Sequence, residues 1–263
     1  MLASERVGPT ALLDILKGPV QAMQDFILIA GRATQNVFRP PHYIDDIALQ
    51  MDSIGVGSLP VVILTGFFTG AVMAMQLARA LTTYGATDQV PPVLCITLVR
   101  ELGPVLTALM VSGRNASGIA SELGSMKVSE QIDAMRALGT DPIQKLVTPR
   151  LIATATMLPL LTIISDFVGM VGGFVISRFL LAMTPSQFWS TAWRALQYND
   201  VVQGLLKPFV FAIIIALVGC YFGMQTTGGT QGVGRATTQA VVISSIWIIV
   251  ATFFIGRIFL NLT

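Results

Sequence analysis

Four ionisable side chains lie within long apolar stretches of this 263-residue sequence: Arg100, Glu101, Asp166 and Lys207. An ionisable group inside a membrane-spanning segment is costly, and it commonly faces a bundle interior or a water-filled cavity. At about 1.5 Å per residue, Arg100 and Lys207 lie at a similar depth below the outer surface of the membrane, in two different apolar segments. Two cations at one depth predict a polar pocket for an anionic amphiphile, with Glu101 holding Arg100 in place.

The same residues also allow a purely structural interpretation. Arg100 and Glu101 could form a buried ion pair, and Lys207 could extend its ammonium group to the membrane surface. Asp166 lies near the middle of its apolar segment and needs a partner. A hydrogen bond to a Ser, Thr or Arg of a neighbouring helix is the favoured interpretation, and proton coupling is the alternative.

A short capped helix is predicted at about residues 130–138, between two apolar stretches. Ser129 is a suitable N-cap residue, and Glu130 and Asp133 suit the positive end of a helix dipole. Gly139 fits the position just after the last helical turn. In ATP-driven transporters, helices of this kind dock into a groove on the nucleotide-binding subunit.

One glycine-rich segment imitates a phosphate-binding loop. Residues 229–236 read Gly-Thr-Gln-Gly-Val-Gly-Arg-Ala. A true loop needs Lys and then Ser or Thr after the last glycine, and a strand before the first. The sequence therefore has no recognisable ATPase of its own, and no cofactor is expected in this chain.

The composition excludes a soluble enzyme and a disordered chain. Only 11% of the residues are charged, against about 25% in ordinary soluble domains. The hydrophobic fraction is 53% and the mean hydropathy is +0.72. One histidine and two cysteines are too few for a metal cluster or a disulfide scaffold, and a net charge of +2 does not suggest nucleic-acid binding. The class that remains is an all-α polytopic membrane protein.

Apolar length predicts five membrane-spanning helices, because each needs about 20 apolar residues. An amphipathic helix in residues 1–40 comes first and is expected to lie in the membrane interface. The spanning domain is expected over residues 45–262. Its spans are predicted at about 53–82, 90–124, 147–180, 200–225 and 236–260.

The distribution of charges predicts the orientation of the chain in the membrane, and the spacing of glycines predicts which helices pack closely. Placing residues 114–150 in the cytoplasm puts most of the 16 Lys and Arg residues on the inner side, with the N-terminus inside and the C-terminus outside. Small residues four apart allow the backbones of neighbouring helices to approach closely. Such pairs occur at Gly66/Gly70, Gly169/Gly173 and Gly219/Gly223.

Five segments, in order, resemble the MlaE family of ABC-transporter permeases. The longest and most specific is Ser121–Pro142, which contains the predicted short helix. The others are Leu98–Arg114, Leu146–Arg150, Phe167–Gly173 and Gly234–Thr238. The resemblance covers essentially residues 45–260.

The resemblance implies a permease that moves glycerophospholipids between the bacterial inner membrane and the outer membrane, driven by a separate ATPase. Two copies of the chain would form the membrane core, with apolar walls from spans one, two and five. Partners would be two copies of the cytoplasmic ATPase, which holds the ATP and magnesium, and a hexameric periplasmic MCE-domain protein. A small STAS-domain protein binds the ATPase in some members. The N-terminus would be cytoplasmic and the C-terminus periplasmic.

The resemblance also assigns residues to two sites. The lipid-binding positions that it implies are Arg100, Glu101 and Lys207. Tyr84, in the turn after the first span, is expected as a further lipid contact. The positions coupling to the ATPase are Glu130, Gln131, Asp133, Met135, Arg136 and Leu138.

Two other functions fit parts of the sequence. Asp166 suggests an ion- or proton-coupled secondary transporter of a lipophilic substrate, although no internal repeat of the kind common in such transporters is visible. A structural anchor for an envelope complex would also span the membrane, but it would gain nothing from costly intramembrane charges. Transport without any ATPase would distinguish the first alternative, and normal transport after removal of the charges would distinguish the second.

Overall fold

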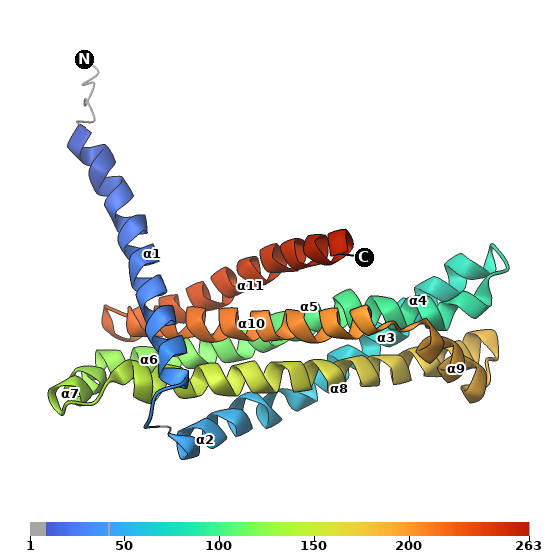
Figure 1. Ribbon diagram of the computed structural model, residues 1–263, viewed down its shortest axis with the longest axis horizontal. Coiled ribbons are helices and arrows are strands. Elements are labelled where there is room, and N and C mark those ends of the chain that lie inside the picture. Colours follow the sequence, from blue (N-terminus) through green and yellow to red (C-terminus); the bar gives the residue numbers. More distant parts are fainter. Residues whose placement is uncertain (1–8, 42, 263) are drawn as a thin grey trace.

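The computed structural model describes residues 9–41 and 43–262, and this part of the chain is helical without strands. Long helices run side by side along one axis, and α1 crosses them at one end (Figure 1). In chain order the α-helices are α1 (Pro9–Val37), α2 (Ile44–Ile54), α3 (Leu59–Thr82), α4 (Val90–Thr97), α5 (Gly103–Val111), α6 (Ser117–Val128), α7 (Gln131–Ala137), α8 (Thr148–Leu181), α9 (Pro185–Ala195), α10 (Tyr198–Met224) and α11 (Gly229–Leu262).

Five helical segments in the described part are long and apolar enough to cross a membrane. They are Ile44–Thr82, Thr87–Val128, Ile143–Leu181, Tyr198–Met224 and Gly229–Phe259. The predicted all-α fold with five spans is therefore confirmed. The first segment begins well before residue 53 because α2, a 3-10 turn (η1, Val56–Ser58) and α3 follow one another with hardly a break.

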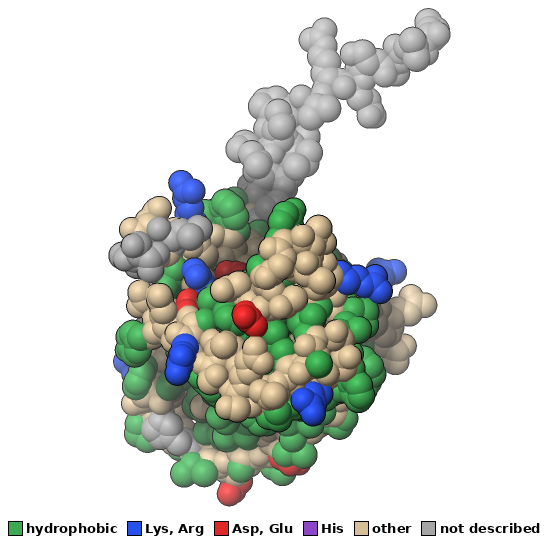
Figure 2. Space-filling model, turned by 90° about the vertical axis from the view of Figure 1, so that its right-hand side faces the viewer, with side chains coloured by type: hydrophobic (Ala, Val, Ile, Leu, Met, Phe, Trp, Pro, Cys, Tyr) green, Lys and Arg blue, Asp and Glu red, His purple; other side chains and the backbone are tan. Residues whose placement is uncertain are grey.

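The bundle has two distinct ends. Helix α7 and the C-terminal end of α1 lie at one end of the bundle, and α9 lies at the other (Figure 1). We call these the α7 end and the α9 end. Helix α11 begins at the α7 end and runs toward the α9 end. Figure 2 views the molecule from the α9 end, where charged side chains are scattered among hydrophobic and polar ones rather than gathered in one patch.

The second span changes helix type twice. Two π-helical turns, η3 (Leu98–Leu102) and η4 (Ser112–Ala116), separate α4, α5 and α6. Pro104 stands in the first turn of α5, directly after η3 and inside one continuous helical span. It has no N–H to donate to a carbonyl of the preceding turn. Each π turn adds about one residue to the helical repeat. Side chains after the turn therefore face a different direction from the one that an unbroken α-helix would give them. Such turns are frequent at functional sites.

The predicted glycine pairs lie where helices touch. A Cβ at Gly70 of α3 would overlap the backbone of Gly169 in α8, and one at Gly66 would lie 2.8 Å from the carbonyl oxygen of Ser165. On α10, a Cβ at Gly223 would lie 2.7 Å from Leu123 Cβ in α6. The close packing expected from these spacings is therefore confirmed.

Gly70→Ala is expected to destabilise the protein because the obstacle is backbone rather than a movable side chain. Overpacking of this kind costs about 1–3 kcal/mol, so the melting temperature in detergent should fall by several degrees. Gly113→Ala is the matched control, since nothing lies within 4 Å of a Cβ at that position. Equal melting temperatures for the two variants would contradict the α3–α8 contact.

Helix α1 docks on the bundle with part of its length. The ring centroids of Phe26 and Tyr221 are 5.6 Å apart, and Ala33 is fully buried against the α7 end of the core. Met23 and Ile27 remain 66% and 60% exposed, so this helix presents a second apolar face outward. Of the predicted interfacial helix 1–40, residues 1–8 lie outside the described chain.

Candidate functional site

A cluster of charges joins the first π turn to α10. Lys207 is fully buried, and its Nζ lies 2.7 Å from Glu101 Oε2. The same Nζ donates a hydrogen bond of 2.7 Å to the backbone carbonyl of Arg100. The sequence left open that Lys207 reaches the membrane surface; its complete burial shows that it does not.

The partner of Arg100 is Asp200 rather than Glu101. Arg100 Nε lies 3.4 Å from Asp200 Oδ1, and Gln203 Nε2 donates to Glu101 Oε1 at 3.3 Å. The predicted pairing of Glu101 with Arg100 is therefore wrong. Sequence reasoning also missed Asp200 and Gln203, although they precede Lys207 by seven and four residues and so share its helix face.

The cluster is balanced in charge but unequal in access. It contains two cations and two carboxylates, so it carries no net charge when all four are ionised. Arg100 and Glu101 have side chains 32% and 46% exposed, whereas the side chain of Asp200 is 8% exposed and that of Lys207 fully buried. Arg100 and Glu101 can therefore contact a ligand. Their buried partners, Asp200 and Lys207, fix the positions of these two side chains.

An apolar groove between the first two spans adjoins this cluster. It has a volume of about 480 Å³ and is lined from α3 by residues such as Phe68 and Val72. Leu102, the residue after Glu101, also lines it, together with Leu106 and Met110. On the fifth span, a Cβ at Gly256 would lie 4.0 Å from Glu101 Oε1, so α11 approaches the same cluster.

Tyr84 is not part of this cluster. It lies in the turn after α3 and is 83% exposed. Within the described chain, no hydrogen bond or ion pair joins its side chain to the charged residues. Its predicted contact with lipid stays a prediction.

Asp166 faces a separate cavity between the second, third and fourth spans. The cavity measures about 250 Å³, and its lining is mostly apolar, including Cys95, Trp189 and Trp193. Among the described residues Asp166 Oδ1 is buried without a hydrogen-bond partner, and a Cβ at Gly103 would overlap it. The favoured interpretation, a hydrogen bond to a neighbouring helix, is therefore not borne out at this oxygen.

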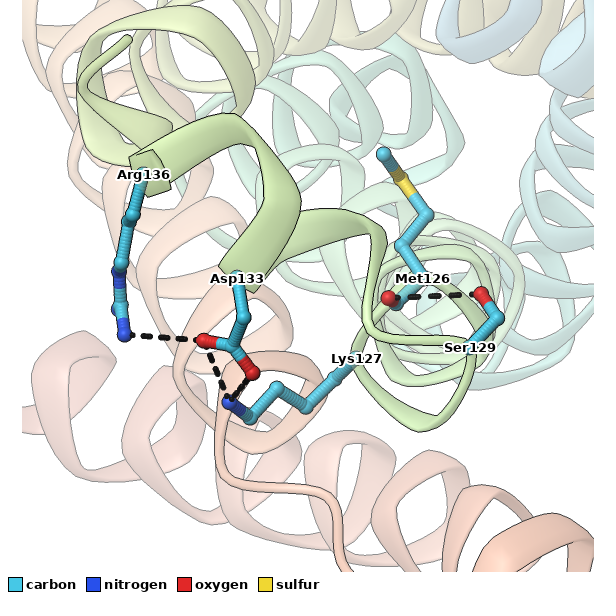
Figure 3. Close-up of polar contacts among 5 residues, drawn as sticks. All are labelled: Met126, Lys127, Ser129, Asp133 and Arg136. Carbon is cyan, nitrogen blue, oxygen red and sulfur yellow. Dashed lines mark hydrogen bonds and ion pairs between the residues drawn. The ribbon is translucent and has the colours of Figure 1, made fainter. Parts of the chain in front are cut away.

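Helix α7 forms the predicted short helix, but its start differs from the expectation. Ser129 does not cap it, because its Oγ donates back to the carbonyl of Ser125 at 2.8 Å. Figure 3 shows Ser129 directed toward α6. Glu130 occupies the N-cap position with φ 61°. At the other end Gly139 has φ 79°, and Thr140 N donates to Met135 O at 3.0 Å, which confirms the predicted helix end.

The charged side chains of α7 are already paired within the chain. Lys127 Nζ lies 2.8 Å from Asp133 Oδ2, and Arg136 Nη1 lies 3.3 Å from Asp133 Oδ1 (Figure 3). The hydrogen bond from Lys127 holds the pKa of Asp133 below its usual value. The pair therefore stabilises the folded state fully above the ordinary pKa of an aspartate. This stabilisation is lost as the pH falls through the lowered pKa of Asp133.

The surface that α7 presents is mixed. Leu138 is 84% exposed, and Glu130, Gln131 and Arg136 are also exposed. Met135 is only partly buried and packs against the core cluster at this end, where Ile132 is fully buried. An exposed leucine surrounded by charges is a suitable contact for a partner protein.

Comparison with known proteins finds one family and several relatives. Residues 47–258 match the family model for permease MlaE. A probable ABC transporter permease protein of Rickettsia felis is 41% identical over 239 residues, covering 91% of this chain and 92% of the relative. One from Synechocystis is 47% identical over 207 residues, covering 79% of each. The chloroplastic protein TRIGALACTOSYLDIACYLGLYCEROL 1 of Arabidopsis thaliana is 38% identical over 232 residues, covering 88% of this chain and 66% of that protein.

Proposed function

The chain belongs to the MlaE permease family, and from this premise we propose that it carries glycerophospholipids. It is the membrane-spanning subunit of an ABC transporter, and ATP hydrolysis belongs to a separate subunit. The observation that supports a phospholipid substrate is the charged cluster at Arg100 and Glu101 beside the apolar groove between α3 and α5.

The cluster suits a phospholipid headgroup because its accessible groups carry both signs. Arg100 can form charge-assisted hydrogen bonds to a phosphate, and the exposed carboxylate of Glu101 can accept an ammonium group. Asp200 keeps Arg100 oriented until a phosphate competes for it. The buried Lys207 binds the carboxylate of Glu101 and the Arg100 carbonyl in the π turn. It therefore acts as a positioning residue rather than as a direct contact of the lipid.

The acyl chains would lie in the groove, whose apolar lining favours hydrocarbon. Helix α11 leaves large side chains such as Trp247, Phe253 and Phe254 more than half exposed. A second copy of the chain facing α3 and α11 would close the groove into a cavity. The lipid in the name of the Arabidopsis relative agrees with a glycerolipid substrate.

Each end of the bundle would meet a different partner. The α7 end would lie in the cytoplasm, where Glu130–Leu138 of each copy of the chain docks on one ATPase, so that the complex holds two ATPase copies. A STAS-domain protein bound to the ATPase would be a further partner. The α9 end would face the periplasm and a hexameric MCE-domain protein that leads to the outer membrane. The chain would then be a multi-pass protein of the bacterial inner membrane, with a cytoplasmic N-terminus.

One observation favours a second candidate, an ion- or proton-coupled transporter. Asp166 has a buried oxygen that no described residue hydrogen-bonds, at the edge of a cavity, as a proton-carrying carboxyl would. Such a transporter would work without an ATPase.

Purification of the tagged chain from its native membrane in mild detergent, followed by mass spectrometry, tests the proposal. We expect an ATPase and an MCE-domain protein in stoichiometric amounts, with bound phospholipid. Arg100→Gln should lower the bound phospholipid severalfold, whereas Arg79→Gln, which changes an exposed arginine at the α9 end, should not. A chain that elutes alone and transports lipid in proteoliposomes would favour the coupled transporter and contradict the proposal.

A further inference from the structure

We propose that a pocket at the α7 end of the groove between the first two spans is a second phosphate site, which binds the headgroup of a glycerophospholipid from the leaflet at that end. This inference rests on the proposed phospholipid substrate. The pocket measures about 290 Å³ and lies between α2 and the second π turn. Its polar lining comes from Gln50, Ser53, Arg114, Asn115 and Glu122.

Arg114 is held rigidly at this pocket. Its Nη1 donates to the carbonyl oxygen of Ser53 at 3.0 Å and to Ser58 Oγ at 3.1 Å. The guanidinium packs on Gly57, where any Cβ would collide with it. In the described part of the chain, no carboxylate forms an ion pair with Arg114. The donors of Nε and Nη2 therefore remain for a ligand, in a planar arrangement that matches a phosphate.

Asn115 supplies an independent observation. Its side chain lines the same pocket and the residue is only 6% exposed, yet Nδ2 has no hydrogen-bond partner in residues 9–41 and 43–262. A buried donor without an acceptor is unfavourable. A phosphate oxygen would provide the missing acceptor, and the amide of Gln50 and the hydroxyl of Ser53 could reach the remaining oxygens.

The charged residues around the pocket carry a net positive charge, which favours a phosphate. Glu122 lines the pocket, but Arg150 Nη2 lies 2.8 Å from Glu122 Oε2, and Arg150 is 3% exposed. Arg114, Arg150 and Glu122 together leave one positive charge. A phosphodiester carries one negative charge, so the ligand would neutralise the site.

The pocket continues the groove already described. Arg114 lies one helical turn beyond Met110, the last groove residue on α5. Arg100 and Arg114 each stand in a π turn of the second span, about 21 Å apart along the helix at 1.5 Å per residue. The groove thus has a headgroup site at each end, with an apolar wall between them for the acyl chains. A lipid that passes from one site to the other must turn over.

Photocrosslinking of the intact transporter tests this proposal. The probe is a phosphatidylethanolamine with a photoreactive diazirine on its headgroup, incorporated into nanodiscs of the purified complex. Mass spectrometry then locates the adducts. We expect one set within residues 50–58 and 112–122, and a second set within residues 98–102 and 200–207.

Variants separate the two sites. Arg114→Gln and Asn115→Leu should each lower the first set of adducts about tenfold and leave the second set unchanged. Gln50→Glu adds a repelling charge without touching the bonds of Arg114 to Ser53 and Ser58, so it should have the same effect even if Arg114→Gln disturbs folding. Gln50→Lys should preserve or increase these adducts. Arg39→Gln, at an exposed arginine near the same end, is the control.

Each alternative outcome has a distinct meaning. Absence of the first set in the unmodified protein, or its persistence in both Arg114→Gln and Gln50→Glu, would overturn the second site. Loss of the first set on addition of excess inorganic phosphate would assign the pocket to free phosphate and overturn the lipid assignment. Absence of the second set alone would count against the proposed function at Arg100, while the first set would still support the site at Arg114.

Discussion

Lys207→Met is expected to reduce phospholipid transfer by the reconstituted transporter at least tenfold and to lower its melting temperature. The substitution removes a fully buried ammonium group that binds both Glu101 Oε2 and the Arg100 carbonyl. Hydrogen bonds to charged groups contribute about 1.5–3 kcal/mol each. Glu101 is partly exposed, so water will replace some of the lost interaction. The Arg100 carbonyl and the π turn have no such substitute, so Arg100 should lose its position.

The double variant Lys207→Met with Glu101→Gln tests this explanation. The amide removes the uncompensated carboxylate, so the melting temperature should recover in part, and the two substitutions should not be additive. Phospholipid transfer should remain low because Glu101 itself contacts the headgroup in the proposed site. Arg79→Gln controls for the loss of a cation. Unchanged transfer and stability in Lys207→Met would contradict the positioning role.

Leu138→Asp should separate the permease from its ATPase while leaving the fold of the permease intact. Leu138 is 84% exposed, so its replacement costs the isolated chain little, whereas a charge in a docked interface would be buried without a partner. We expect at least tenfold weaker copurification of the ATPase and a matching loss of lipid-stimulated ATP hydrolysis. Glu130→Lys, which reverses an exposed charge beside it, should act in the same direction.

The control for this experiment is Arg39→Gln, which alters an exposed arginine near the same end without changing α7. Ile132→Ser is a useful contrast, because that side chain is fully buried and its loss should lower the melting temperature as well as ATPase binding. An intact complex of Leu138→Asp with the ATPase would contradict the assignment of α7 as the docking helix.

Several features followed from the sequence because their causes are local. Apolar length determines the five spans, since a helix that satisfies its own backbone is what an apolar segment can form in a membrane. Gly139 ends α7 because the chain needs a positive φ there. The small residues at Gly66 and Gly70 marked the α3–α8 contact, because close backbone approach requires the absence of side chains.

The sequence alone did not determine the partners of the intramembrane charges. Arg100 and Glu101 are adjacent in the chain, and adjacent side chains on a helix point about 100° apart. Their partners, Asp200 and Lys207, come from another helix, and the π turn sets the direction in which each side chain points. Likewise Asp166 faces a cavity instead of a hydrogen-bond donor. Composition and periodicity identified which residues were costly to bury, but the rotation of each helix about its axis, fixed by packing across the bundle, decided which of them meet.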